Sequence, residues 1–166
     1  MSTTMDRLAF EAAEELGLRL EVVGGWTVWE AHPSTRHQMA VQRIGNSIRP
    51  KLGLGRGCGC VQLMDVNLRF LDGSLKRPDI SVFCRTPDEL DEAVKLLPEA
   101  VIEILSKDYE RKDLELGAPF YLAQGVKDVI VLDPYSGLVR HFRADGEKQF
   151  QSLAEIELEC GCLCTV

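Results

Sequence analysis

The run from Ala100 to Leu105, AVIEIL, is the feature that most limits how this chain can fold. Its residues are apolar except for one carboxylate, Glu103. A short run of β-branched and aliphatic residues is typical of a central strand that is buried on both faces of a sheet. A glutamate in such a strand is costly to bury unless it is paired, protonated or bound to a metal. The run therefore predicts a sheet core with one paired or functional carboxylate inside it.

Helical and strand patterns surround this run. A capping pair, Thr3 and Asp6, predicts a first helix that ends at Gly17, and Ser34 is a plausible N-cap of a second helix that ends before Pro50. Residues 86–97 form an acidic helix or turn, and residues 106–125 have a helical composition. The predicted strands share short apolar or alternating runs and cover 19–24, 26–31, 60–64, 66–70, 78–83, 98–105, 127–134 and 137–143, with a short one over the cysteine-rich tail.

Helices that alternate with strands around a strand-rich middle favour an α/β fold, with a mixed sheet flanked by helices. The sequence has no internal repeat or linker that would divide it, and 166 residues are enough for one core, so we expect a single domain over residues 1–166. No apolar run approaches the roughly 20 residues that a membrane helix needs. The acidic, amphipathic N-terminal segment is neither a secretory signal nor an Arg-rich transit peptide, so we expect a cytoplasmic protein without membrane contact.

Charge bears on any role in nucleic-acid binding. The formal net charge is −7, whereas a dedicated DNA-binding domain usually carries a basic surplus. One segment, residues 36–56, is basic and contains no acidic residue. It predicts either a phosphate-facing surface or simply a solvated helix face. Its cations are Arg36, Arg43, Arg49, Lys51 and Arg56.

The six cysteines fall in an unusual pattern. Cys58-x-Cys60 lies in a glycine-rich loop, Cys84 stands alone, and the tail contains Cys160, Cys162 and Cys164 at alternate positions. Without a signal peptide, we do not expect a disulfide framework. Structural zinc sites usually use Cys-x2-4-Cys spacing, whereas alternate residues of a strand share one face. Buried strand cysteines and a zinc-bound cysteine module are therefore both open.

Asp79 and Glu103 are the residues most suited to chemistry. Asp79 follows Pro78 at the start of a predicted strand, where its carboxylate can point into a cleft at the sheet edge. Mg²⁺ favours one or two protein carboxylates together with water and substrate phosphate. Two carboxylates on separate strands could form such a site. The alternative for Glu103 is a salt bridge with an arginine at the sheet edge.

The order of segments from Arg77 to Pro134 resembles the Uma-two family within the PD-(D/E)XK, restriction endonuclease-like nuclease superfamily. The matching segments are RPDISVF and the longer PEAVIEILSKDYERKDLELGAPFYLAQGVKDVIVLDP. Upstream, VWEAHPSTRHQMAVQRI resembles the family segment in which a glutamate-bearing strand leads into a helix. The resemblance covers nearly all of the chain, and its specificity lies in the ordered combination. It implies Mg²⁺- or Mn²⁺-dependent hydrolysis of DNA phosphodiester bonds.

The resemblance also implies roles for individual residues. Asp79 and Glu103 would be metal-binding carboxylates, and the backbone carbonyl of Ile104 would reach the same ion. Glu30 would be a further carboxylate near the site, and His37 would contact phosphate or assist proton transfer. For these last two residues the alternatives are a solvated glutamate at a strand end and a helix-capping histidine. Arg36, Arg43, Lys51 and Arg56 are the expected nucleic-acid contacts.

The chain departs from the superfamily pattern at its lysine. Two residues after the glutamate stands Leu105, and the later family position, four residues before Tyr121, is Gly117. Lys112, or else Lys107, could reach the site from the following segment. The departure leaves open an alternative function, a catalytically silent nucleic-acid-binding or interaction module. Because restriction-like nucleases commonly cut two strands as symmetric pairs, the resemblance also implies a homodimer.

Overall fold

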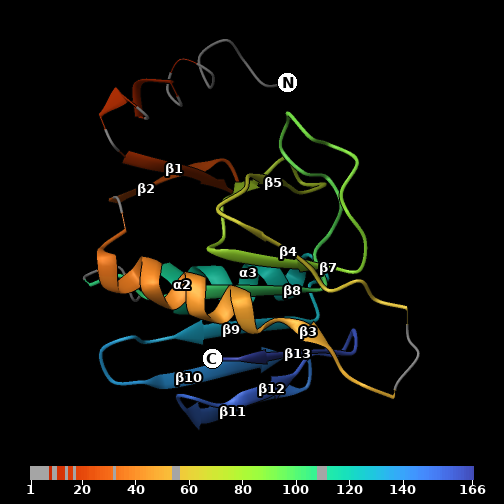
Figure 1. Ribbon diagram of the computed structural model, residues 1–166. Helices are drawn as coiled ribbons and strands as arrows, with labels where there is room; N and C mark the ends of the chain where they lie inside the picture. The colour runs from red at the N-terminus through yellow and green to blue at the C-terminus, as the bar shows by residue number, and fades with distance from the viewer. Residues whose placement is uncertain are drawn as a thin grey trace.

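A computed structural model describes residues 8, 11–13, 15–16, 18–31, 33–53, 57–107 and 112–166. Three sheets and two main helical segments make up this part of the chain (Figure 1). The largest sheet has six strands in the order β11-β10-β9-β8-β7-β4. Its strands in chain order are β4 (Val61–Met64), β7 (Ile80–Phe83), β8 (Ala100–Ile104), β9 (Asp128–Leu132), β10 (Leu138–Arg143) and β11 (Gly146–Gln151).

The sheet is mixed, and β8 lies near its middle. β8 pairs with β9 in parallel and with β7 antiparallel, and the other neighbouring pairs are antiparallel. All five residues of β8 and all five of β9 are buried. The predicted central strand and its buried glutamate are therefore confirmed, because a strand with neighbours and cover on both faces has no exposed side chain.

Helices cover the two faces of this sheet. On one face lies α2 (Thr35–Ser47), which packs Ala40, Val41 and Ile44 against the strands. On the other face lies a π-helical turn, η1 (Lys112–Gly117), that continues into α3 (Ala118–Ala123). In Figure 1 the orange α2 lies in front of β8 and the teal α3 behind it. Alternate residues of β8 therefore enter two separate cores.

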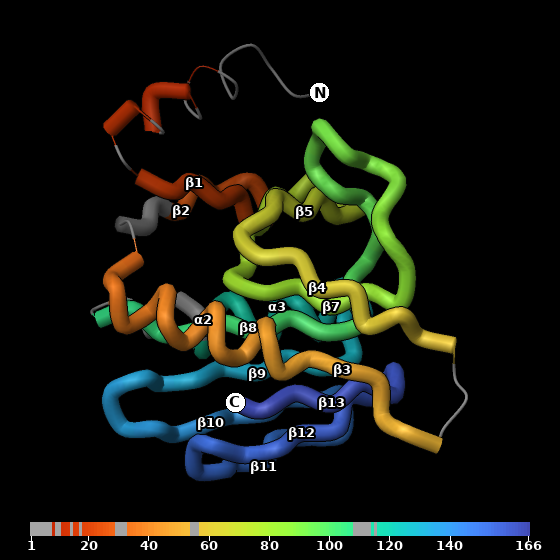
Figure 2. The backbone as a smooth tube through the Cα atoms, in the orientation of Figure 1, coloured from red at the N-terminus to blue at the C-terminus, as the bar shows by residue number. Residues whose placement is uncertain are grey.

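Two smaller sheets complete the described structure. One has the order β2-β1-β6-β5, from β1 (Leu18–Val23), β2 (Trp26–Ala31), β5 (Leu68–Arg69) and β6 (Leu75–Lys76). The other has the order β12-β13-β3, from β3 (Arg49–Pro50), β12 (Glu155–Glu157) and β13 (Cys162–Thr165). In the tube view, the segments coloured red to orange for β1 and β2 lie above the six-stranded sheet, and the blue β12 and β13 lie at its lower end (Figure 2).

A buried ionic network joins the C-terminal sheet to β9. The carboxylate of Asp128, which has no exposed surface, accepts hydrogen bonds from His141 Nε2 at 2.7 Å, Arg143 Nε at 2.6 Å and the Glu159 N–H at 2.8 Å. Burial by itself would raise the pKa of Asp128, but these hydrogen bonds outweigh it and lower the pKa below its ordinary value. The network is structural, since all its described members hold strands and a turn together.

Most predicted elements are confirmed, including the hairpin of β1 and β2, the helix capped by Ser34 and the strands β4, β5, β7, β8, β9, β10 and β13. Residues 86–97 form bends with one bridge between Leu68 and Val94, and no helix. The sequence analysis missed β3, β6, β11 and β12. Thr3, Asp6 and Gly17, which bound the predicted first helix, lie outside the described residues. Within the described part of the chain, no helix is long and apolar enough to cross a membrane.

Candidate active site

Asp79 and Glu103 lie side by side at the ends of two neighbouring strands. The antiparallel register of β7 and β8 pairs Ile80 with Ile102, and its continuation by one residue places Asp79 opposite Glu103. The Asp79 N–H donates to Glu103 Oε2 at 3.1 Å. Both side chains are buried, with 6% and 5% of their residue surface exposed. The expectation that the two carboxylates converge therefore agrees with the geometry.

The carboxylate of Asp79 is surrounded by donors from three elements. Its Oδ2 accepts the Ile104 N–H at 2.8 Å and lies 3.1 Å from His37 Nε2. Its Oδ1 lies 3.6 Å from Nη1 of Arg19, a buried arginine of β1 that also forms an ion pair with Asp65. The site thus holds the Asp79 carboxylate in one orientation with contacts from three elements.

His37 reaches this carboxylate because of how α2 begins. Ser34 caps the helix by accepting the His37 N–H at 3.3 Å, which places His37 in the first turn, over the edge of the sheet. The imidazole is 3% exposed. Its second nitrogen, Nδ1, is buried and has no hydrogen-bond partner among the described residues. His37 therefore contacts Asp79 and offers one further nitrogen, instead of acting as a cap as the alternative interpretation held.

Glu103 is held from the α3 side of the sheet. Its Oε1 accepts a hydrogen bond from the hydroxyl of Tyr121 at 2.9 Å. The ring of Tyr121 lies 5.3 Å from Nζ of Lys76, a residue that is 1% exposed. Lys76 Nζ donates to Glu21 Oε2 at 2.7 Å, and the Arg77 N–H donates to Glu21 Oε1 at 2.9 Å. A chain of buried polar contacts thus leads from Glu103 to the four-stranded sheet.

Sequence reasoning missed three of these residues, Arg19, Glu21 and Lys76. Arg19 and Glu21 stand at alternate positions of β1 and therefore share one face, which the alternation alone indicates is solvent-exposed. In the structure both residues are buried, with Arg19 beside Asp79 and Glu21 bonded to Lys76 of the neighbouring strand β6. The one local signal was Lys76, which stands three residues before Asp79.

Other predicted site residues are only partly placed by the structure. The backbone of Glu30 lies in β2 opposite Arg19, and its side chain is outside the described part of the structure. Lys112 begins the π-helical turn η1, and its side chain is likewise outside the described part of the structure. Lys107 is exposed at the end of the segment after β8. Ile104 contributes its N–H to Asp79, and the role of its carbonyl stays a prediction.

Two of the predicted basic contacts, Arg36 and Arg43, lie on the exposed side of α2. Together with Pro134 they line an open pocket of about 570 Å³ at the end of β9. The guanidinium of Arg36 lies 5.2 Å from the ring centroid of Tyr135. Since Leu132 of β9, which lines the same pocket, pairs with Ile104 of β8, this surface borders the end of the sheet that carries Glu103.

The rest of the basic segment is engaged elsewhere. Lys51 Nζ donates to Glu157 at 2.6 Å, and Arg49 pairs with Glu155. These contacts tie β3 and the residue after it to β12, and the role of Lys51 in nucleic-acid binding stays a prediction. Arg56 lies outside the described residues.

The geometry limits which residues could hold a metal. In the described part of the chain, groups of three histidine, cysteine or acidic side chains with all ligand atoms within 4.8 Å of one another consist of cysteines alone. Asp79, Glu103 and His37 do not form such a group. A hard cation at the carboxylates would therefore have two protein carboxylates at most as its main ligands, with water and phosphate as the others.

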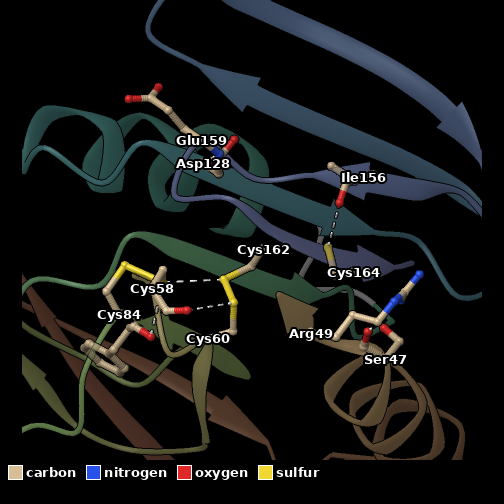
Figure 3. The surroundings of a disulfide bond; sticks show 11 residues. Ser47, Arg49, Cys58, Cys60, Cys84, Asp128, Ile156, Glu159, Cys162 and Cys164 are labelled. Carbon is tan, nitrogen blue, oxygen red and sulfur yellow. Dashed lines mark hydrogen bonds between the residues drawn. A yellow bond between two sulfur atoms is a disulfide. The ribbon is translucent and has the colours of Figure 1, made fainter. Parts of the chain in front are cut away.

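The cysteines contradict one expectation. The structure pairs Cys58 with Cys84 and Cys60 with Cys162, so the expectation of no disulfides is wrong (Figure 3). The prediction rested on the N-terminal sequence, which bears on the cellular compartment and carries no information on which sulfurs meet in space. Spacing along the sequence could not show it, because the pairs are separated by 26 and 102 residues.

A mixed sheet covered by helices on both faces, with paired carboxylates at its edge, has the architecture of restriction endonuclease-like proteins. The family model for Uma2, described as "Putative restriction endonuclease", matches residues 5–159, and the chain belongs to this family. No curated protein matches significantly. A crystal structure described as a "putative nuclease belonging to DUF820", from Anabaena variabilis, superposes with a TM-score of 0.62 at 22% identity and covers 82% of this chain and 79% of its own. That likeness establishes the fold.

Proposed function

We propose that this chain is a divalent-metal-dependent nuclease that hydrolyses DNA phosphodiester bonds, with Asp79 and Glu103 as its metal-binding carboxylates. The observation that carries the proposal is the placement of these two buried carboxylates opposite each other at the ends of β7 and β8. Membership of a family described as a restriction endonuclease supports the reaction class. Burial of two acidic groups is costly, and a metal site is one of the few arrangements that compensates it.

The residues fit Mg²⁺ or Mn²⁺. Such ions bind one or two protein carboxylates and keep water and phosphate oxygens as their other ligands. Asp79 and Glu103 would supply the carboxylates, and the Ile104 carbonyl is the proposed third protein ligand. When bound, the ion would polarise the scissile phosphate and lower the pKa of an attacking water. The backbone N–H groups bonded to each carboxylate fix its orientation.

His37 is suited to proton transfer at this site. Its Nε2 is engaged by Asp79, which leaves Nδ1 as the nitrogen that can exchange a proton with water or contact phosphate. Arg19 adds a buried positive charge beside the same carboxylate. That charge would stabilise a phosphate drawn to the edge of the sheet.

The superfamily lysine has no equivalent at its two usual positions, where Leu105 and Gly117 are buried. Lys112 is the proposed source of the missing amine, and Lys107, which is exposed, is the second choice. Lys76 is close to the site but engaged by Glu21, so it would act by positioning Tyr121. A nuclease built this way is expected to be slower than relatives that keep the lysine.

Arg36 and Arg43 are the proposed phosphate contacts. Each phosphate contact contributes a slope of about 0.9 to the dependence of log affinity on log salt concentration. The Arg36→Ala/Arg43→Ala variant should therefore bind DNA more weakly, with a salt slope reduced by about 2. Arg49→Ala is the matched control, because Arg49 is already paired with Glu155. A salt slope that is the same in the double variant and the wild type would reject this surface.

The test is a cleavage assay on double-stranded and single-stranded DNA and on RNA, with Mg²⁺, Mn²⁺ or chelator. We expect metal-dependent cleavage of DNA by the wild type and a loss of at least about 100-fold in Glu103→Gln and Asp79→Asn. Glu99→Gln is the matched control, since Glu99 precedes the same strand at its other end and pairs with Lys127. Circular dichroism verifies that each variant folds. Unchanged cleavage by folded Glu103→Gln would overturn the proposal.

A second function is favoured by one observation. The carboxylates of Asp79 and Glu103 are already satisfied by described protein donors, and Leu105 stands where a catalytic lysine is usual. A silent nucleic-acid-binding module on this fold would bind DNA in a salt-sensitive way without turnover. Calorimetric titration of Mn²⁺ into wild type and the Asp79→Ala/Glu103→Ala variant separates the two functions. A nuclease requires that wild type binds Mn²⁺ and that the variant does not, whereas a silent module does not require this difference.

Three further expectations belong to this proposal. A homodimer would place two active sites on the two strands of a duplex, and sedimentation analysis measures it. A single domain over residues 1–166 predicts one cooperative unfolding transition. A cytoplasmic location is to be tested by cell fractionation.

A further inference from the structure

Five of the six cysteine sulfurs collect at one place, away from the carboxylates. Cys58 is their centre: it is bonded to Cys84, its Sγ lies 3.5 Å from that of Cys162, and it lies within 4.8 Å of both Cys60 and Cys160. Figure 3 shows the two disulfides next to each other, with a dashed line between Cys58 and Cys162. Two disulfides that served only to hold loops together would not need to lie in contact with each other, as Cys58–Cys84 and Cys60–Cys162 do.

Three separate segments bring these sulfurs together. The loop before β4 supplies Cys58 and Cys60, and the residue after β7 is Cys84. The turn before β13 supplies Cys160, and β13 begins with Cys162. The Gly59 N–H donates to the Cys84 carbonyl at 2.8 Å, and a Cβ at Gly59 would lie 2.9 Å from that oxygen. Glycine is therefore required where the two segments cross.

The C-terminal turn is also built around a Cys-Gly-Cys sequence. Gly161 has a φ of +91°, a left-handed conformation that glycine adopts without strain. The Gly161 N–H donates to Leu158 O at 2.9 Å, and the Leu158 N–H donates to Cys162 O at 2.8 Å. This tight turn directs Cys162 toward the loop of Cys58.

We propose that in the reduced protein this cluster binds one Zn²⁺ through the thiolates of Cys58, Cys60, Cys84 and Cys162. Zinc bound to four thiolates at about 2.3 Å needs sulfurs about 3.8 Å apart. The sulfurs of Cys58, Cys60 and Cys162 lie within 4.8 Å of one another, with 3.5 Å between Cys58 and Cys162. Cys84, whose sulfur is grouped with that of Cys58, would turn toward the other two once its disulfide is reduced. Cys60 and Cys162 are buried, whereas Cys58 and Cys84 are partly exposed, which gives the ion a path to the site. Four thiolates leave no open position, so the site is structural.

The disulfide and zinc forms are related by a balanced exchange. Two equivalents of a dithiol reductant deliver four electrons and four protons to the two disulfides, and each dithiol becomes a disulfide. The four thiols that result release their protons to solvent as the thiolates bind Zn²⁺. Cys160, a free thiol within 4.8 Å of Cys58 and Cys84, is placed to attack the Cys58–Cys84 bond and open it by exchange.

This site is separate from the proposed nuclease site. Asp79 precedes β7 and Cys84 follows it, so the four residues of this strand lie between them and separate them by about 17 Å of extended chain. The zinc would hold the loop before β4 and the C-terminal turn against the end of β7. It does not depend on the proposed function.

The experiment starts with the full chain purified with a dithiol and without added metal, followed by elemental analysis and alkylation in denaturant with chelator. We expect one zinc per chain and six alkylated cysteines. Three results would each overturn the proposal. The first is zinc-free protein in which only two cysteines are alkylated, and the second is zinc-free protein in which all six are alkylated but which takes up neither Zn²⁺ nor Co²⁺. The third is iron in place of zinc.

Variants identify the ligands. Cys58→Ser and Cys84→Ser should lose zinc, whereas Cys160→Ser and Cys164→Ser should keep it. Cys164 is the matched control, because its thiol contacts Ile156 O at 3.8 Å, away from the cluster (Figure 3). If the ligand variants do not fold, Co²⁺ replacement in wild type gives the answer, since tetrahedral thiolate coordination has intense visible absorption. Zinc retained in folded Cys58→Ser, or a Co²⁺ spectrum without thiolate bands, would contradict the assignment.

Discussion

Replacing Lys76 with methionine should destabilise the protein by breaking a fully buried ion pair. Lys76 is 1% exposed, its partner Glu21 is 2% exposed, and their charged atoms are 2.7 Å apart. Removing one member of such a pair leaves an uncompensated charge and costs about 3–5 kcal/mol. Because the Arg77 N–H still donates to Glu21, we expect the lower end, about 3 kcal/mol. In a chain of this size, that lowers Tm by roughly 6–12 °C.

The double variant Lys76→Met/Glu21→Gln removes both charges. The amide oxygen introduced by Glu21→Gln would still accept the Arg77 N–H, so we expect the double variant to cost about 1 kcal/mol, well below the sum of the two single variants. Urea unfolding followed by circular dichroism measures the two single variants and the double variant against wild type. A Lys76→Met variant that costs less than about 1 kcal/mol, or a double variant as costly as the sum of the singles, would refute the reasoning.

Three other substitutions have defined outcomes. Asp128→Asn should cost about 3 kcal/mol in urea unfolding at neutral pH. Because folding lowers the pKa of Asp128, the stability that its carboxylate contributes is present above the unfolded pKa of about 3.9 and is lost as pH falls through the folded pKa. The variant should therefore lose stability less steeply than wild type on acidification. Gly59→Ala should cost about 1–3 kcal/mol, because the new methyl group would overlap the Cys84 carbonyl, and a thermal midpoint equal to that of wild type would contradict this. Tyr121→Phe removes the hydroxyl bonded to Glu103 and should cost about 2 kcal/mol in urea unfolding, whereas an unchanged midpoint would mean that water replaces it.

The fold was largely predictable because its strands carry strong local signals. AVIEIL is apolar enough to be central, and Gly24-Gly25 marks a hairpin turn that the structure contains. β11 was missed because its sequence, GEKQFQ, is polar and mostly exposed, so no apolar alternation distinguishes it from a loop. β6 is only two residues long, and its pairing with β5 and with distant β1 defines it.

The site was predictable only in part. The sequence indicated Asp79 and Glu103 because a proline precedes one and an apolar strand contains the other. Arg19 and Glu21 escaped notice because charged residues at alternate positions usually face solvent, and only the packing of one sheet on another buries them here. The cysteine cluster could not be predicted because its members meet across up to 102 residues of sequence.

The short strand β7 has the carboxylate of Asp79 just before it and the disulfide-bonded Cys84 just after it. Side chains of a strand change face with every residue, so a slip of one position would turn Asp79 away from Glu103. β7 is buried at all four positions and pairs with β8 and β4, so packing specifies its register. Cys84, bonded to Cys58 just after β7, adds a second constraint on the same strand. The cysteines therefore bear on the alignment of the two carboxylates through the backbone of β7, without touching them.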